Sequence, residues 1–169
     1  MTKPHNILFL CNGNSARSIL AEALATTLSN GRLIGFSAGA KPAGMVHPIV
    51  IEMVKTMGYP LELLSSKSWD QFGREDAPKM DFIITLCDSA AGEECPYWPG
   101  HPSTAHWGFP DPAAVEDGDE AMMHAFKQVE IGLRNRIELL MDLPLTQLDR
   151  LELNEHLQSI HHQIKFGQE

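Results

Sequence analysis

The sequence predicts a three-layer α/β fold, in which a four-stranded parallel sheet has helices on both faces. Two observations predict this class. First, short apolar runs alternate along the chain with longer segments in which apolar residues recur every three or four positions. Second, the apolar runs lack the polar alternation of a half-exposed strand, which is typical of strands buried on both faces of a parallel sheet. In such a sheet the ligand site lies at the carboxyl ends of the strands.

Each element has its own sequence signal. Four apolar runs are expected to be strands: residues 6–11, 33–37, 82–87 and 105–109. Four stretches with helical periodicity are expected to be helices: residues 18–29, 49–57, 122–140 and 153–164. Gly31 and Gly58 follow the first two helices as stop signals. Asp117, with Glu120 three residues later, is expected to cap the third helix.

The composition fits one acidic domain. The chain has 169 residues, of which 43% are hydrophobic, so it can bury a real core. Its 13 basic and 22 acidic side chains give a net charge of −9, which repels phosphate backbones and anionic lipid. Neither nucleic acid nor a membrane is therefore an expected partner. The longest apolar run, residues 7–11, is too short to span a bilayer, and the first six residues lack a secretory signal, so we expect a cytoplasmic protein.

The turn between the first strand and the first helix carries the strongest functional signal. Residues 11–18 read Cys-Asn-Gly-Asn-Ser-Ala-Arg-Ser. Gly13 and its flanking asparagines tolerate left-handed backbone conformations, in which successive N–H groups can point inward and bind an anion. The helix N-terminus adds partial positive charge, and the planar fork of Arg17 matches two oxygens of a tetrahedral oxyanion. The expected oxyanion-binding residues are Asn12, Gly13, Asn14, Ser15, Ala16, Arg17 and Ser18.

Cys11 stands at the mouth of this expected anion site, at the end of the first strand. We expect its thiol to be ionised there and to act as a nucleophile on a phosphate-like substrate. The alternative is a small buried hydrophobe at a strand end, which is the commoner use of a lone cysteine. The strand, the Gly/Asn turn, the arginine and the serine occur in order, and that order favours the nucleophile.

Residues 11–18 resemble the phosphate-binding loop of the low-molecular-weight protein tyrosine phosphatases and of the thioredoxin-coupled arsenate reductases that share their fold. The similarity continues through Ser37-Ala38-Gly39, Thr85-Leu86-Cys87, His106-Trp107-Gly108-Phe109 and Asp111-Pro112-Ala113. It implies a phosphatase-like arsenate reductase domain over residues 1–142. Residues 143–169 are then expected to form a C-terminal helical extension packed on the same domain.

The three cysteines, Cys11, Cys87 and Cys95, separate the two activities. An odd count argues against a disulfide scaffold. A phosphatase needs one nucleophile, whereas a reductase moves two electrons and needs thiols that can form a disulfide. The segment between Cys87 and Cys95 is small, polar and acidic, so it can change conformation at little cost. The alternatives are a buried core thiol for Cys87 and an incidental loop thiol for Cys95.

The resemblance implies that arsenate is reduced to arsenite by a relay. Cys11 attacks arsenate, Cys87 forms a disulfide with Cys11 as arsenite leaves, and Cys95 takes over that disulfide, which thioredoxin reduces. No metal and no bound cofactor is implied. One departure from those reductases is that seven residues, instead of the usual six, separate Cys87 from Cys95.

Two other functions remain open at this point. The first alternative is a low-molecular-weight protein tyrosine phosphatase that hydrolyses phosphotyrosine or aryl phosphates through a Cys11 phosphoenzyme. Such an enzyme would not need Cys95. The second is an oxyanion or redox sensor, which would bind its ligand without turnover.

The resemblance also implies roles around the loop. Asp111 matches the general acid of both relatives, and its alternative role is that of a turn or cap aspartate. Asn14 is expected to brace the loop through side-chain hydrogen bonds. Ser18 is expected to donate to the Cys11 sulfur, and its alternative role is a simple helix cap.

Two cation questions follow from the sequence. Some of these reductases hold a monovalent cation with residues similar to Asn14, Glu22 and Ser37. Lys67 aligns with a further carboxylate of that site, so its ammonium group is expected to take the place of the cation, and no potassium requirement is expected. Zinc is not expected either, because the spacing of Cys95, His101 and His106 does not match a compact zinc site. His161-His162 is expected to be a solvated helix face.

Overall fold

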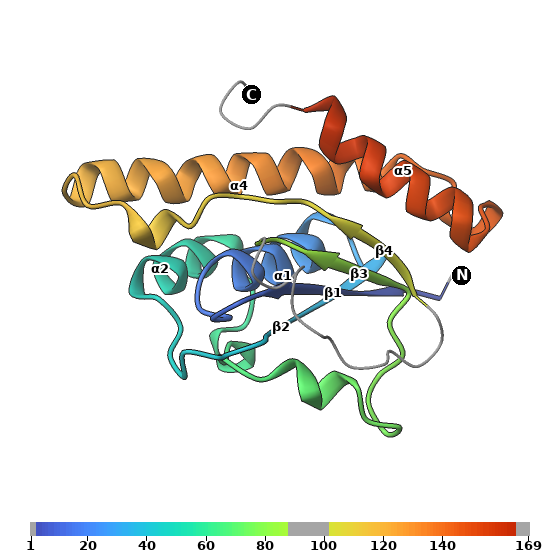
Figure 1. The fold of residues 1–169 in the computed structure, drawn as a ribbon, viewed down its shortest axis with the longest axis horizontal. Coiled ribbons are helices and arrows are strands. Elements are labelled where there is room, and N and C mark those ends of the chain that lie inside the picture. Colours follow the sequence, from blue (N-terminus) through green and yellow to red (C-terminus); the bar gives the residue numbers. More distant parts are fainter. Residues whose placement is uncertain (1–2, 88–101, 165–169) are drawn as a thin grey trace.

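The computed structural model describes residues 3–87 and 102–164 of the chain. Four strands form one parallel sheet in the order β2-β1-β3-β4 (Figure 1). Their bounds are β1 (His5–Cys11), β2 (Leu33–Gly39), β3 (Phe82–Thr85) and β4 (Ser103–His106). The predicted α/β class and its parallel four-stranded sheet are confirmed.

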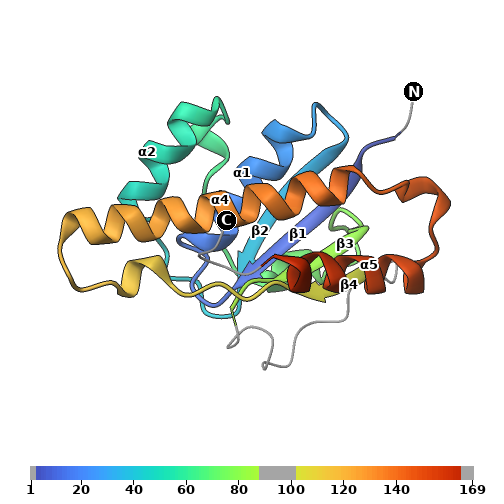
Figure 2. The same ribbon diagram turned by 90° about the horizontal axis from the view of Figure 1, so that it is seen from above.

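The α-helices of the described residues cover one face of this sheet (Figures 1 and 2). They are α1 (Arg17–Leu28), α2 (Pro48–Met57), α4 (Asp119–Met141) and α5 (Arg150–Gln163). Helix α1 packs against β1 and β2, α4 lies across α1, and α5 lies along β4. The larger of the two apolar clusters fills the space between these helices and the sheet.

A shorter layer covers the opposite face. The 3-10 helix η2 (Trp69–Phe72) places two aromatic side chains against the sheet, where they meet Leu8 and Leu10 of β1 and Ile83 of β3. The remaining 3-10 helices of the described chain are η1 (Leu61–Leu63), η3 (Pro112–Ala114) and η4 (Leu145–Gln147). The sheet is therefore buried on both faces, as the apolar runs predicted.

Several element boundaries differ from the sequence prediction. Strand β3 ends at Thr85, so Cys87 lies two residues beyond it. Strand β4 begins two residues earlier than expected and ends at His106. The chain then leaves the regular ladder, although Phe109 N still donates to Leu86 O at 2.9 Å. The last helix ends at Gln163, and Ile164 is extended.

The expected cap of the third helix is wrong. The N-cap of α4 is Gly118, with φ 105° and no side-chain hydrogen bond, and Asp117 lies one residue before it. A φ in this region costs glycine little, which allows the chain to turn sharply into the helix. Asp119 and Glu120 instead place negative charge in the first turn, where it interacts favourably with the helix dipole.

The strand register brings the functional residues to one edge of the sheet. Cys11 pairs with Gly39 at the end of β1, and Thr85 pairs with His106 at the end of β3. The loops that follow these strands therefore open at the same carboxyl edge, where α/β sheets bind ligands.

Close packing of α1 on β2 depends on Gly35. A Cβ at this position would overlap the backbone carbonyl of Glu22 in α1. We expect Gly35→Ala to lower the free energy of unfolding by about 1–3 kcal/mol, because neither backbone can move away without loss of packing. Urea denaturation measures this change. Ile34→Thr, on the exposed side of the same strand, serves as the control and should change stability by about 0.5 kcal/mol or less. An equal loss in both variants would contradict the packing argument.

Candidate active site

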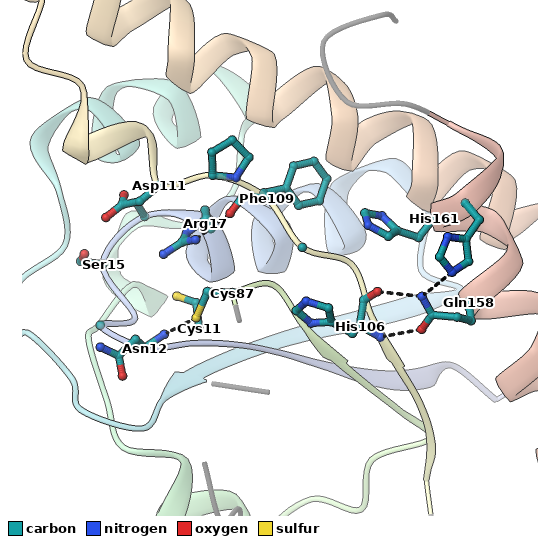
Figure 3. A pocket seen from close by; sticks show the side chains of 15 residues that line it. Cys11, Asn12, Ser15, Arg17, Cys87, His106, Phe109, Asp111, Gln158 and His161 are labelled. Atoms are coloured by element: carbon teal, nitrogen blue, oxygen red, sulfur yellow. Dashed lines mark hydrogen bonds between the residues drawn. The ribbon is translucent and has the colours of Figure 1, made fainter. Parts of the chain in front are cut away.

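A large pocket opens at the carboxyl edge of the sheet (Figure 3). Its volume is about 860 Å³. The loop after β1, the end of β3, the segment after β4 and helix α5 form its walls. The lining residues are Cys11, Asn12, Gly13, Ser15, Ala16, Arg17, Cys87, His106, Gly108, Phe109, Pro110, Asp111, Gln158, His161 and His162. The pocket therefore brings together most of the residues that the sequence singled out, and adds several from α5.

Backbone hydrogen bonds fix the orientation of the loop after β1. The carbonyls of Asn12, Gly13 and Ser15 accept hydrogen bonds of 2.8–2.9 Å from N–H groups within residues 41–47. A trans peptide holds its N–H opposite to its C=O, so the N–H groups that follow these carbonyls point away from that segment and towards the pocket. Successive inward N–H groups at a helix N-terminus form an anion site.

Asn14 braces this loop from inside. Its backbone is left-handed, with φ 45°, and its side chain is fully buried. The amide Oδ1 accepts a hydrogen bond of 2.9 Å from Lys67 N, and Nδ2 donates to Ser18 Oγ at 2.7 Å. The short polar side chain of asparagine makes this backbone conformation affordable. The expected bracing contacts are therefore present.

Ser18 lies against the sulfur of Cys11, with an Oγ–Sγ distance of 2.9 Å. The Ser18 oxygen also accepts from Asn14 Nδ2, so this hydroxyl links the asparagine to the sulfur. A hydroxyl that donates to sulfur stabilises the ionised form of that sulfur. The alternative role of Ser18 as a helix cap is wrong, because the N-cap of α1 is Ala16 and Ser18 lies inside the first turn.

Cys87 reaches the same loop from the end of β3. Its Sγ accepts a hydrogen bond of 3.0 Å from the backbone N–H of Asn12, the residue that follows Cys11. Both cysteines are buried and not disulfide-bonded, and both sulfurs face the pocket (Figure 3). The structure thus places a second thiol beside the first. Cys95 lies outside the described residues.

Arg17 and Asp111 form the opposite rim. Arg17 Nη1 donates to the backbone carbonyl of Phe109 at 2.7 Å, which ties the guanidinium to the segment after β4. Asp111 is exposed and lines the pocket near Arg17 (Figure 3). One carboxylate oxygen of Asp111 accepts from Ala113 N at 3.0 Å and so caps η3. The cap role and the pocket position of this aspartate therefore coexist.

A charge pair between the buried Glu22 and the half-buried Lys67 lies behind the loop. Lys67 Nζ lies 2.7 Å from Ser65 O, 3.5 Å from Asn14 Oδ1 and 4.0 Å from Glu22 Oε1. Burial raises the pKa of Glu22, and hydrogen bonds from Ser37 and Tyr59 and the charge of Lys67 oppose that rise. Burial lowers the pKa of Lys67, which Glu22 opposes. The ammonium group therefore lies among oxygen atoms of Asn14, Ser37, Ser65 and Glu22.

The sequence reasoning missed the contribution of α5. Gln158, His161 and His162 line the pocket, although the expectation was that both histidines form a solvated helix face. His162 is exposed, but His161 is half-buried. The Nδ1 atom of His161 accepts a hydrogen bond of 3.1 Å from Arg136 Nε. The apolar stripe of α5 predicted packing, but no local motif indicated where the other side of the helix would lie.

Two features are absent from the residues that the structure describes. No helix among them is both long and apolar enough to cross a membrane. Nor do these residues contain a cluster of three or more side chains with metal-binding groups.

The fold, the loop after β1 and the two neighbouring thiols are those of the low-molecular-weight phosphatase class. Residues 6–153 match the family described as low molecular weight phosphotyrosine protein phosphatase, and the chain belongs to this family. The chain is 38% identical over 130 residues to an arsenate reductase of Halalkalibacterium halodurans. The aligned region covers 76% of this chain and 90% of that protein. It is 33% identical over 132 residues to an arsenate reductase of Bacillus subtilis, and the aligned region covers 78% of this chain and 91% of that protein.

The fold comparison agrees with these relatives. A solved arsenate reductase in a phosphate-binding state superposes with a TM-score of 0.64 at 27% identity, and covers 81% of this chain and 96% of that one. A solved arsenate reductase in an intermediate state gives a TM-score of 0.62 at 28% identity over 81% of this chain and 96% of that one. The family match ends at residue 153, within α5.

Removal of the Lys67 charge should make the free energy of unfolding more dependent on the ionisation of the buried Glu22 carboxylate. In Lys67→Met the pKa of folded Glu22 rises further, because the Coulombic opposition to burial is gone. The folded state then holds a proton that the unfolded state releases near pH 4.5, so stability falls as pH rises above that value. We expect the variant to lose more stability than the wild type between about pH 5 and pH 8.

Urea denaturation at several pH values measures this slope. Lys55→Met removes an exposed lysine of α2 and should leave the pH dependence as in the wild type. Parallel pH profiles for Lys67→Met and the wild type would contradict the charge pairing.

Proposed function

We propose that this chain reduces arsenate to arsenite. Relatives named arsenate reductase share 32–38% identity with it over most of its length. The observation that carries the proposal is the position of Cys87, whose sulfur lies against the N–H of Asn12, beside the loop cysteine. A phosphate hydrolase needs one thiol at this place, whereas a reductase needs two that can become a disulfide.

The first step is attack of the Cys11 thiolate on the arsenic atom. The inward N–H groups of the loop and the guanidinium of Arg17 bind the arsenate oxygens and stabilise the charge that develops. An As–S bond forms and one arsenic–oxygen bond breaks, and the departing oxygen leaves as water after protonation. Asp111, on the rim beside Arg17, supplies that proton. Arsenic remains As(V) in this step.

The second step transfers two electrons. The thiolate of Cys87 attacks the Cys11 sulfur, an S–S bond forms, and the S–As bond breaks. The bonding pair passes to arsenic, which leaves as arsenite, As(III), while the two sulfurs are oxidised to a disulfide. The pocket location of both sulfurs supports this step, because groups held close together in one site react readily.

The last steps regenerate the enzyme. Cys95 attacks the Cys87 sulfur, which releases the Cys11 thiolate and moves the disulfide to Cys87–Cys95. A dithiol protein of the thioredoxin class then reduces this disulfide and is itself oxidised. The support for this part is the cysteine inventory, which leaves no thiol without a role. The small acidic segment between the two cysteines fits the change of pairing that it requires.

The alternative is hydrolysis of phosphotyrosine or aryl phosphates through a Cys11 phosphoenzyme. The family description favours it, as does the carboxylate of Asp111 on the rim of the pocket. Cys11, Arg17 and Asp111 would suffice for that reaction, and the other two cysteines would be dispensable.

Replacement of the second and third cysteines separates the two reactions. We expect Cys87→Ser and Cys95→Ser to lose arsenate-dependent NADPH oxidation, measured with thioredoxin and thioredoxin reductase, by at least about 100-fold, because the disulfide cannot move on. Any hydrolysis of p-nitrophenyl phosphate should persist in both variants, and Cys11→Ser should abolish both activities.

Full arsenate turnover by Cys95→Ser would contradict the relay. Hydrolysis without any arsenate reduction in the wild type would favour the phosphatase. Absence of both activities would favour the third possibility, an oxyanion or redox sensor without turnover.

The two reactions also differ in their need for an acid. We expect Asp111→Asn to lower aryl phosphate hydrolysis by about 10²–10⁴-fold, because a poor leaving group needs a proton in the transition state. Arsenate reduction should fall by a smaller factor, because an arsenic–oxygen bond exchanges with water more easily. Steady-state kinetics of both reactions measure the two ratios.

Asp117→Asn removes an exposed aspartate outside the pocket and serves as the control. An equal loss in both reactions would contradict this difference.

A further inference from the structure

Helix α5 reaches the pocket with residues that lie beyond the end of the family match. The family match ends at residue 153, whereas the pocket residues of α5 are Gln158, His161 and His162. The wall that they form is therefore an addition to the matched domain. The contacts of α5 with the sheet indicate what the addition does.

Gln158 binds one residue of β4 twice. Its Oε1 accepts from His106 N at 3.0 Å, and its Nε2 donates to His106 O at 3.1 Å. Strand β4 is at the edge of the sheet, so these are the backbone groups that a further strand would have bound. The amide thus acts as one residue of an added strand, and it holds the last residue of β4 in place (Figure 3).

The segment that Gln158 holds is the one that anchors Arg17. Three residues after His106, the carbonyl of Phe109 accepts the Arg17 Nη1–H at 2.7 Å. Between them, the Trp107 indole Nε1 donates to Leu157 O of α5 at 2.8 Å. A rotation of this segment would move the carbonyl and the guanidinium together.

The same segment is held from its other end. The guanidinium of Arg136, which is fully buried, lies 4.8 Å from the centroid of the Phe109 ring. Arg136 also donates to His161 Nδ1 at 3.1 Å and to Ile164 O at 3.0 Å, both in or just after α5. Gly132 of α4 makes room for this arrangement, because a Cβ there would lie 2.6 Å from Phe109 Cε1.

We infer that Gln158 is a positioning residue for the oxyanion site, which it serves through the backbone of residues 106–109 and the guanidinium of Arg17. The inference rests on the oxyanion site of the proposed function. It adds that the C-terminal helix fixes the guanidinium of Arg17 through the segment after β4. Misplacement of a catalytic group by about 1 Å can cost on the order of 100-fold in rate, so a two-point anchor of this kind matters to turnover.

The chain offers a matched control in Asn154. This residue is also an amide of α5, and its Oδ1 accepts from Thr104 N of the same strand at 2.7 Å. It lies one turn earlier in the helix and does not line the pocket. Gln158→Met and Asn154→Leu each remove the amide with little change in size. Both should lower the melting temperature, so stability alone does not distinguish them.

The readout is the reactivity of Cys11 towards a charged and a neutral reagent. Rates of alkylation by iodoacetate and by iodoacetamide are followed on the Cys11 peptide by mass spectrometry. The local positive field favours the anionic reagent. We expect the ratio of the two rates to fall about threefold or more in Gln158→Met and to stay within about 1.5-fold of wild type in Asn154→Leu. Gln158→Asn, which keeps the amide one methylene shorter, should give an intermediate ratio.

An unchanged ratio in folded Gln158→Met or in Gln158→Asn overturns the inference and leaves a purely structural amide. Equal falls in the Gln158 and Asn154 variants overturn it as well, because they would report general loosening of α5. The assay uses no arsenate. A chain that shows the expected ratios but reduces no arsenate would contradict the proposed reductase and support the positioning role.

Discussion

The fully buried amide of Asn14 is the constraint on which the active site depends. Its backbone turns the loop through a left-handed conformation, its oxygen ties the loop to Lys67, and its nitrogen donates to the Ser18 hydroxyl, which lies against the Cys11 sulfur. A buried amide must have its donors and acceptors satisfied, so these contacts hold together or fail together. The loop N–H groups therefore point inward before any ligand arrives, which is the preorganisation that oxyanion chemistry needs.

The site has to attract an anion in a protein whose net charge is −9. The structure achieves this locally. The inward N–H groups at the start of α1 and the guanidinium of Arg17 face the pocket, whereas the carboxylate of Glu22 is buried behind the loop and neutralised by Lys67. Within a few ångströms these groups outweigh distant surface charges, because solvent screens the latter. The global acidity thus disfavours polyanions, whereas the groups that face the pocket favour a small anion.

Local signals predicted the parts of the protein that local physics determines. The first strand, its loop and the positions of Cys11, Asn14 and Arg17 follow from a buried run, a Gly/Asn turn and a helix start that lie within a few residues of one another. The true cap of α4 at Gly118 was not predictable from side-chain propensities, because backbone freedom decided it. The pocket wall from α5 was not predictable either. It depends on the angle at which that helix crosses the sheet edge, and this angle is set by packing of Leu153, Leu157 and Ile160.

Helix α5 also changes what the edge of the sheet can do. An open edge strand offers unpaired N–H and C=O groups to any extended chain that comes near. Here Asn154 and Gln158 already occupy the outward backbone groups of Thr104 and His106. A neighbouring molecule that approached β4 as an extra strand would find these positions taken, so the same amides protect the protein from strand-to-strand aggregation at the rim of its own active site.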